Sequence, residues 1–154
     1  MGIHERYGKD VLNKALKSFY GKTLEEHKLD IESCRMTIRI DGVIMSRAKK
    51  KLCAVEIEAR TPKQIRGAVL DLVLYNQRED CRRNLLMIIP TPTHNYCKDD
   101  EKKFCKLLRL LSNPIVKNKV IVLNGNGISK RLRSDVQEVK KELSIFFCVK
   151  TIAN

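Results

Sequence analysis

The sequence predicts one α/β domain over residues 1–154, with a mixed central β-sheet flanked by helices. First, 154 residues is the size of one ordinary domain, which can bury a core without disulfides. Second, apolar residues follow the two-residue period of strands in some segments and the three-to-four-residue spacing of helices in others. Third, these segments alternate without an internal repeat, a low-complexity tract or a linker, so nothing divides the chain.

The chain opens with a predicted helix and two predicted strands. From His4 to Tyr20 apolar residues recur three and four positions apart, and Gly21 follows as a C-terminal stop. Leu29 and Ile31 then alternate with polar neighbours, and the segment 36–44 repeats that two-residue period. We therefore expect a helix followed by two half-buried strands.

A third strand and a central helix come next. Residues 52–59 alternate in the same way and predict a strand. Thr61 is a residue type that caps helices, and Pro62 is favoured at the first helical position. We expect this helix to end near Asn76.

The second half of the chain predicts two more buried strands. Residues 85–89 are continuously apolar, as in a strand covered on both faces, and this strand is expected to lie centrally. Residues 99–112 predict a helix that ends before Pro114, and 120–123 predict a further buried strand. A final helix is expected over 132–143, and an edge strand over 145–149.

Charge points to the partner. The chain has 31 Lys and Arg against 18 Asp and Glu, a net charge of +13, which attracts a polyanion such as nucleic acid. A solvated basic surface is the alternative interpretation. Aromatic residues make up 5% and Trp is absent, so few rings can stack on bases, and duplex or structured DNA is favoured over single strands.

Cysteine usage and hydropathy indicate a compartment. The six cysteines form no C-x-x-C pair and several lie in apolar runs, which is typical of reduced thiols. His94, Cys97 and Cys105 lack a fourth ligand at zinc-finger spacing, so a zinc site is disfavoured. No apolar stretch is long enough to span a bilayer, and no apolar signal core is seen. A cytoplasmic protein without a membrane partner is expected.

Three acids in predicted strands need a physical reason. Carboxylates are depleted from strands, yet Glu56 and Glu58 project from one face of a strand because they are two residues apart. Pairing of the two preceding strands would bring Asp41 close to them. Converging carboxylates repel one another unless a cation lies between them, and Mg²⁺ is the usual hard ion there. The alternative places both glutamates on the solvent face of an edge strand, paired with Lys or Arg.

These residues carry a resemblance to a known family. The segments Ile40-Asp41-Gly42-Val43-Ile44 and Ala54-Val55-Glu56-Ile57-Glu58-Ala59 resemble the signature of the PD-(D/E)XK, or restriction-endonuclease-like, nucleases. The predicted order of helix, three strands, helix and strand over residues 4–89 is similar to that family's core. The resemblance implies a metal-dependent deoxyribonuclease in which Asp41 and Glu56 bind Mg²⁺, or Mn²⁺ in its place. It also implies that Ile57 offers a backbone carbonyl to the metal.

Two further acids extend the implied site. Glu58 stands where the family usually has Lys, and the resemblance leaves it as base, water positioner or additional metal ligand, or as the mark of an inactive site. Glu5 is placed like the helix acid that joins the metal in several branches of the family. A glutamate in a first helical turn is also a common surface residue, because the helix dipole favours it.

Two basic groups are candidate phosphate contacts. A helix N-terminus favours anions, and cations beside it can hold a nucleic-acid backbone. The predicted nucleic-acid-binding residues are Arg60, Lys63, Gln64 and Arg66, with Lys130, Arg131 and Arg133 in a second group. An exposed charge run is the alternative for both groups.

The sequence thus predicts a Mg²⁺-dependent endonuclease that hydrolyses DNA. A homodimer would follow if both strands of a duplex are cut, because a two-fold substrate matches a two-fold protein. A catalytically inactive nucleic-acid-binding or assembly module on the same fold is the first alternative. An RNA-directed nuclease is the second.

Overall fold

The computed structural model describes residues 2–79, 84–90, 96–123 and 132–147, in which four α-helices and five strands occur. In chain order they are α1 (Ile3–Leu16), β1 (Thr23–Ile31), β2 (Met36–Met45), β3 (Lys51–Ile57), α2 (Pro62–Glu79), β4 (Asn84–Pro90), α3 (Lys98–Leu111), β5 (Lys117–Leu123) and α4 (Leu132–Phe147). A short 3-10 helix (Glu32–Cys34) joins β1 to β2.

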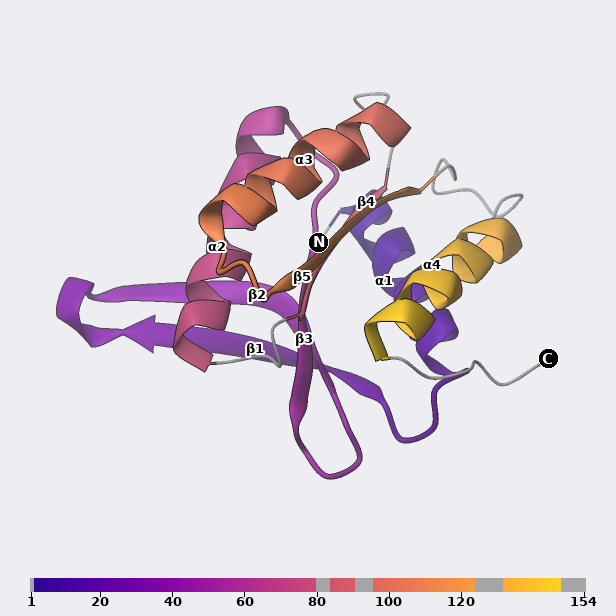
Figure 1. Cartoon of the computed structure of the whole chain (residues 1–154), viewed down its shortest axis with the longest axis horizontal. Coiled ribbons are helices and arrows are strands. Elements are labelled where there is room, and N and C mark those ends of the chain that lie inside the picture. Colours follow the sequence, from indigo (N-terminus) through magenta and orange to yellow (C-terminus); the bar gives the residue numbers. More distant parts are fainter. Residues whose placement is uncertain (1, 80–83, 91–95, 124–131, 148–154) are drawn as a thin grey trace.

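The five strands form one mixed sheet in the order β1-β2-β3-β4-β5. The β1/β2 and β2/β3 pairs are antiparallel, whereas the β3/β4 and β4/β5 pairs are parallel. Helices α1 and α4 cover one face of the sheet, and α2 and α3 cover the other (Figure 1). The predicted α/β class with a mixed, helix-flanked sheet is confirmed, and so is the order of helix, three strands, helix and strand. Kinship with the restriction-endonuclease-like core stays a prediction.

The inner strands are buried on both faces. All seven residues of β4 are buried, and β3 is buried from Cys53 to its end. This follows from the parallel crossovers, because each one lays a helix across a face of the sheet. Since β3 is the middle strand, Glu56 and Glu58 are buried at 7% and 6% exposure. Their alternative placement on the solvent face of an edge strand is therefore wrong.

Two predicted helix ends are also wrong, and one of them is that of α2, which continues to Glu79 instead of ending near Asn76. The first helix ends at Leu16 rather than Tyr20, because the chain tightens into turns in which Phe19 N–H donates to the Leu16 carbonyl. Phe19 nevertheless stays buried and packs edge-on against Phe147, so the apolar spacing outlasts the helix. Gly21 adopts a left-handed φ of 69° in the turn that follows.

The predicted edge strand over 145–149 is contradicted, because its first three residues are the last turn of α4. Phe146 is buried at helical spacing after Leu143 and Val139, and this packing against the α1 side of the sheet overrides the local strand preference of the aromatic residues. Residues 148–149 lie outside the described residues.

A β-bulge in β2 sets the position of Asp41. Glu25 pairs with Val43 and His27 with Ile40, so two steps along β1 correspond to three along β2. Ile40 and Val43 consequently face the same core cluster, which strict alternation would forbid. The extra residue turns Asp41 toward the α2 side of the sheet.

Two glycines allow the close packing around this point. A Cβ on Gly42 would lie 2.5 Å from Leu24 Cδ1, so only glycine lets β1 pass beside the bulge. A Cβ on Gly8 would lie 2.6 Å from Ile57 Cγ2, so α1 can lie directly over the end of β3. The Gly8 contact holds α1, which carries Glu5, against the end of β3, and the Gly42 contact holds β1 against the part of β2 that carries Asp41.

Replacing Gly42 with alanine is expected to destabilise the protein by about 1–3 kcal/mol, because the new methyl group meets Leu24 and the Glu25 carbonyl. Gly67→Ala is the matched control, since nothing lies within 4 Å of its Cβ position and alanine is the better helix former. Urea denaturation of both variants measures the difference. Equal stability of Gly42→Ala and the wild type would contradict the bulge packing.

Candidate functional site

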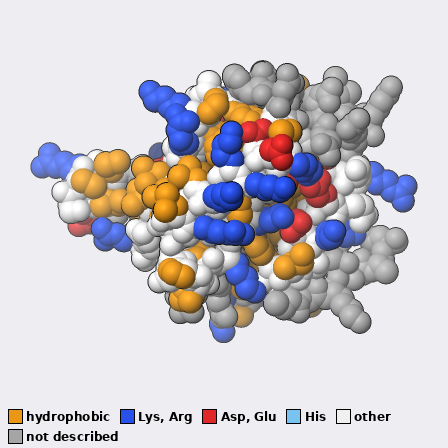
Figure 2. Space-filling view, turned by 45° about the horizontal axis from the view of Figure 1, so that its top comes forward, with side chains coloured by type: hydrophobic (Ala, Val, Ile, Leu, Met, Phe, Trp, Pro, Cys, Tyr) orange, Lys and Arg blue, Asp and Glu red, His pale blue; other side chains and the backbone are white. Residues whose placement is uncertain are grey.

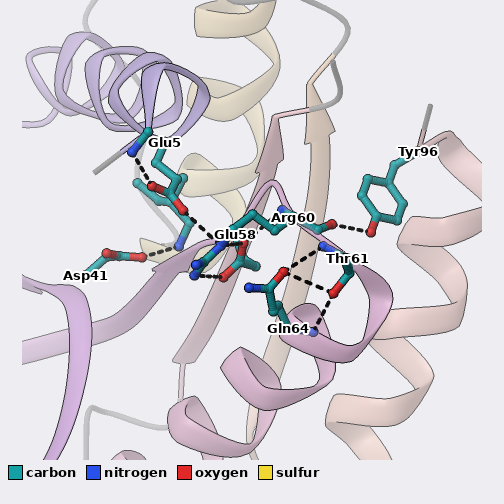
Figure 3. Close-up of polar contacts among 9 residues, drawn as sticks. Glu5, Asp41, Glu58, Arg60, Thr61, Gln64 and Tyr96 are labelled. Atoms are coloured by element: carbon teal, nitrogen blue, oxygen red, sulfur yellow. Dashed lines mark hydrogen bonds and ion pairs between the residues drawn. The ribbon is translucent and has the colours of Figure 1, made fainter. Parts of the chain in front are cut away.

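An open cavity of about 560 Å³ lies at the end of β3, beside the first turns of α1 and α2. It is lined by five carboxylates, Glu5, Asp41, Glu56, Glu58 and Asp71, and by two guanidinium groups, Arg39 and Arg60. The close-up in Figure 3 shows how several of these side chains converge from different elements. All three acids predicted from the strands, together with Glu5 and Ile57, are therefore at one place.

Asp41 and Glu56 form the centre of the cavity. The register that pairs Gly42 with Val55 places Asp41 opposite Glu56 one step further along. Burial, a hydrogen bond with Asp41 and the charge of Asp41 together raise the pKa of Glu56 to about 11. In the absence of a cation Glu56 therefore keeps its proton and donates it in a hydrogen bond to Asp41.

The backbone of Ile57 faces the same point. Its N–H donates to Asp41 Oδ2 at 2.6 Å, and in an extended strand the carbonyl of a residue points to the same side as its N–H. The Ile57 carbonyl is thus directed toward the β2 side, where Asp41 lies. This is the placement that the family resemblance implied for it.

Glu58 is held by Arg60 rather than by the other acids. The guanidinium group of Arg60 donates from Nε to Oε1 and from Nη2 to Oε2 of Glu58, both at 2.9 Å, and the Arg60 backbone N–H adds a third bond at 2.8 Å. Burial alone would raise the pKa of Glu58, but these bonds outweigh it and lower the pKa overall. Glu58 is therefore a charged carboxylate whose two oxygens are both engaged.

Glu5 reaches the cavity from the first turn of α1. Its Oε2 accepts the Gly2 N–H at 2.7 Å, and its Oε1 lies 3.6 Å from Arg60 Nε. One of its oxygens thus completes the start of the helix while the other faces Arg60. Arg60 consequently lies between two acids, as Figure 3 shows.

The predicted phosphate contacts are only partly brought to the cavity. Gln64 lines it, but the Gln64 amide oxygen accepts the N–H of Thr61 at 3.1 Å, which completes the cap at the start of α2. Lys63 and Arg66 are exposed on α2 outside the cavity lining. Arg133 is exposed at the start of α4, and the other two members of its group, residues 130 and 131, lie outside the described residues.

Two lining residues were missed by the sequence analysis. Arg39 is exposed on β2 two positions before Asp41, between the buried residues Ile38 and Ile40, and no pattern in the sequence marks it as a cavity residue. Asp71 follows Gln64 by seven residues, which is two helical turns, so it lies on the same face of α2. Burial raises the pKa of Asp71, and its charge in turn raises that of Glu56.

A further group of exposed cations lies on α3. Figure 2, which brings the α3 side forward, shows Lys and Arg side chains grouped across the middle of that face. On α3, Lys102, Lys106 and Arg109 are exposed, recur at helical spacing and make no ion pair with any described residue. The Tyr96 hydroxyl, just before this helix, donates to the Arg60 carbonyl at 2.6 Å. The start of α3 is thus held beside Arg60, whereas Lys102, Lys106 and Arg109 lie further along the helix and line a hollow beside Lys119 of β5.

Metal-ligand geometry is partial as the side chains stand. Within the described ranges no group of three or more His, Cys, Asp or Glu side chains converges on one point as a metal site would require. Asp41 and Glu56 converge, whereas Glu58 is turned to Arg60. Cys97 and Cys105 carry free thiols, and His94 lies outside the described residues.

No protein family, no curated protein and no solved structure matches the chain. None of the helices in the described part combines the length and apolar composition needed to cross a bilayer. The argument for function consequently depends on the chemistry of the cavity.

Glu56→Gln is expected to change how stability depends on pH. The unfolded chain loses the Glu56 proton near pH 4.5, whereas the folded protein keeps it to about pH 11, so the free energy of unfolding falls as pH rises between these values. Glutamine stays neutral and can still donate to Asp41. In EDTA at pH 8 we expect the variant to be about 1–3 kcal/mol more stable than the wild type.

Denaturation of the wild type, Glu56→Gln and Glu26→Gln from pH 5 to pH 9 makes this measurement. Glu26 is the control because its side chain is 79% exposed, so the same change there should leave the pH dependence as it is. A wild-type curve with the same slope as that of Glu56→Gln would show that no shared proton exists.

Proposed function

We propose that this protein is a Mg²⁺-dependent endonuclease that hydrolyses phosphodiester bonds of DNA. The observation that carries the proposal is the contact between half-buried Asp41 and buried Glu56, two carboxyl groups side by side in one cavity of a strongly basic protein. Burying acids without a cation is costly, and a shared proton is the substitute available when no metal is bound. The pair therefore has the character of a cation site.

The donor set fits Mg²⁺. This ion keeps several waters and is commonly held by one or two carboxylates together with substrate phosphate. Asp41, Glu56 and the Ile57 carbonyl would supply the protein oxygens, and the cavity has room for water and a phosphate group. When bound, Mg²⁺ would polarise the phosphodiester and lower the pKa of the attacking water.

The remaining lining residues would bind and orient the substrate. Arg39 is exposed at the rim beside Asp41 and would hold a backbone phosphate next to the scissile one. The N-terminus of α2 opens beside the cavity, where its dipole favours an anion. Glu58 and Asp71 would each stay negatively charged or accept a proton from the attacking water, depending on the environment of the carboxyl group. Both are therefore candidates to orient the nucleophile.

Nucleic acid would reach the cavity along the basic surface. A polyanion on the exposed cations of α3 would be led toward Arg60 and the acids, because Tyr96 fixes the start of this helix against the Arg60 carbonyl. Lys63, Arg66 and Arg133 would extend that contact. A homodimer would present two cavities to the two strands of a duplex.

One observation favours an inactive binding module instead. Glu58 is neutralised by Arg60, which leaves two carboxylates rather than three near the centre. Such a protein would bind DNA without cutting it. The cleavage experiment separates the two functions.

Asp41→Asn and Glu56→Gln are each expected to lower Mg²⁺-dependent cleavage by about 100-fold or more, because each removes a charged ligand of the proposed ion. Supercoiled plasmid and a labelled duplex are incubated with enzyme in Mg²⁺, Mn²⁺ or EDTA, and matched RNA substrates are run in parallel. Asp99→Asn, an exposed acid on α3, is the control and should cut like the wild type. Equal cutting by wild type and Asp41→Asn would remove the site, and binding without cutting would leave the inactive module.

Removing Lys102, Lys106 and Arg109 together is expected to weaken DNA binding and its dependence on salt. Each lost phosphate contact lowers the slope of log affinity against log salt by about 0.9, so a decrease of roughly 2–3 is expected. Fluorescence anisotropy in EDTA measures it. Alanines at three other exposed lysines, Lys17, Lys50 and Lys141, remove the same charge; an equal change in slope would show that the α3 face has no particular role.

A further inference from the structure

The ion pair between Glu58 and Arg60 is asymmetric in its exposure. The Glu58 side chain is 8% exposed, whereas the Arg60 side chain is 61% exposed. One end of the pair is thus buried at the cavity wall and the other faces solvent at the mouth. An incoming anion can therefore contact the guanidinium group of Arg60, whereas the carboxylate of Glu58 is largely shielded from solvent.

Glu58 shares the cavity with the proposed metal ligands. Glu58 lies two residues beyond Glu56 on the same face of the chain and lines the same cavity. Its backbone N–H donates to the Ile88 carbonyl at 3.1 Å, so the main chain there continues the pairing with β4. If the ion pair with Arg60 broke, the Glu58 carboxylate would be a third acid beside Asp41 and Glu56.

We propose that Arg60 is a latch that holds Glu58 away from the cation until a phosphate of the substrate takes the guanidinium group. The proposal rests on the proposed function and adds an order to it. Arg60 is a positioning residue in this scheme, since it acts through Glu58. The sequence analysis expected Arg60 to be a simple phosphate contact.

Release of Glu58 and release of Arg60 are coupled, because each side chain needs a new partner of opposite charge when their ion pair breaks. A carboxylate buried to this degree cannot lose Arg60 without a replacement cation, and the guanidinium group loses two charge-assisted bonds unless an anion replaces Glu58. With metal and phosphate both present, Glu58 pairs with the metal and Arg60 pairs with the phosphate, so the charges stay balanced. Each ligand therefore strengthens the binding of the other.

Glu5 belongs to the same arrangement. Its Oε1 lies 3.6 Å from Arg60 Nε, which is a looser contact than the 2.9 Å bonds to Glu58. The guanidinium group thus lies between two acids and contacts Glu58 more closely than Glu5. If it moves away from Glu58, it still has Glu5 beside it. A phosphate at the mouth would be met by a guanidinium group that is still guided by α1.

The first test measures Mn²⁺ binding without nucleic acid by isothermal titration calorimetry. Arg60→Ala should bind Mn²⁺ about tenfold more tightly than the wild type, because Glu58 becomes available as a ligand. Lys63→Ala removes a neighbouring positive charge that holds no acid of the cavity and controls for electrostatics alone. The double variant Arg60→Ala/Glu58→Gln should lose the gain, and Arg60→Lys should lie between wild type and Arg60→Ala.

The second test measures binding of a fluorescein-labelled DNA duplex in EDTA. Glu58→Gln should bind the duplex about tenfold more tightly than the wild type, because Arg60 is released for phosphate. Asp71→Asn removes one negative charge from the same cavity without touching Arg60 and is the matched control. A structural ion pair would show neither gain, and circular dichroism confirms that each variant is folded.

The outcomes separate this inference from the proposed function. If Asp41→Asn does not weaken Mn²⁺ binding, the proposed function fails and the latch fails with it. If Asp41→Asn weakens Mn²⁺ binding but Arg60→Ala matches Lys63→Ala, the cation site stands and the latch alone is overturned. Should Glu58→Gln bind DNA no better than Asp71→Asn, the latch is likewise overturned.

Discussion

The β-bulge at Asp41 and Gly42 is the constraint on which the whole cavity depends. A regular β2 would send Asp41 and Ile40 to opposite faces of the sheet, and the acid would then lie on the side away from α2. The extra residue keeps Ile40 in the core and also directs Asp41 at Glu56. Gly42 makes this possible because β1 passes too closely for any side chain. A packing feature in an antiparallel hairpin thus decides the chemistry at the end of a parallel strand.

The two buried glutamates of β3 meet the cost of desolvation in opposite ways. Glu56 keeps its proton, because burial and Asp41 both disfavour its charge. Glu58 keeps its charge, because the bonds from Arg60 outweigh the same burial. Residues two apart on one strand thereby have pKa values displaced in opposite directions, and pairs of this kind are where acid and base roles are found in enzymes. The difference arises from a single arginine two residues further along the chain.

The sequence anticipated the elements and the meeting of the acids, and the reasons lie in local patterns. Period-two alternation located β2 and β3, and the Thr61-Pro62 start located α2, because caps and pleats act over a few residues. The bulge was beyond reach, since it follows from how β1 passes Gly42 and alternation by itself assumes a regular strand. The partner of Glu58 was missed for a similar reason: Arg60 was taken as a phosphate contact, and only the burial of Glu58 shows what holds it. The strand over 145–149 was wrong because Phe146 packs as part of a helix.

The acidic cavity and the basic surface act on a phosphate backbone in opposite ways. A net charge of +13 would itself attract a phosphate backbone at many points, without selecting one. Five carboxylates inside one cavity repel that backbone unless a cation is present, so close approach there depends on the ion, whereas contact along α3 does not. Under the proposed function, the surface would supply binding that is independent of metal, and the cavity would supply a position that only metal makes acceptable to a phosphate. Arg60 lines this cavity with a side chain that is 61% exposed, so the proposed exchange of Glu58 for a phosphate would take place where the cavity opens to solvent.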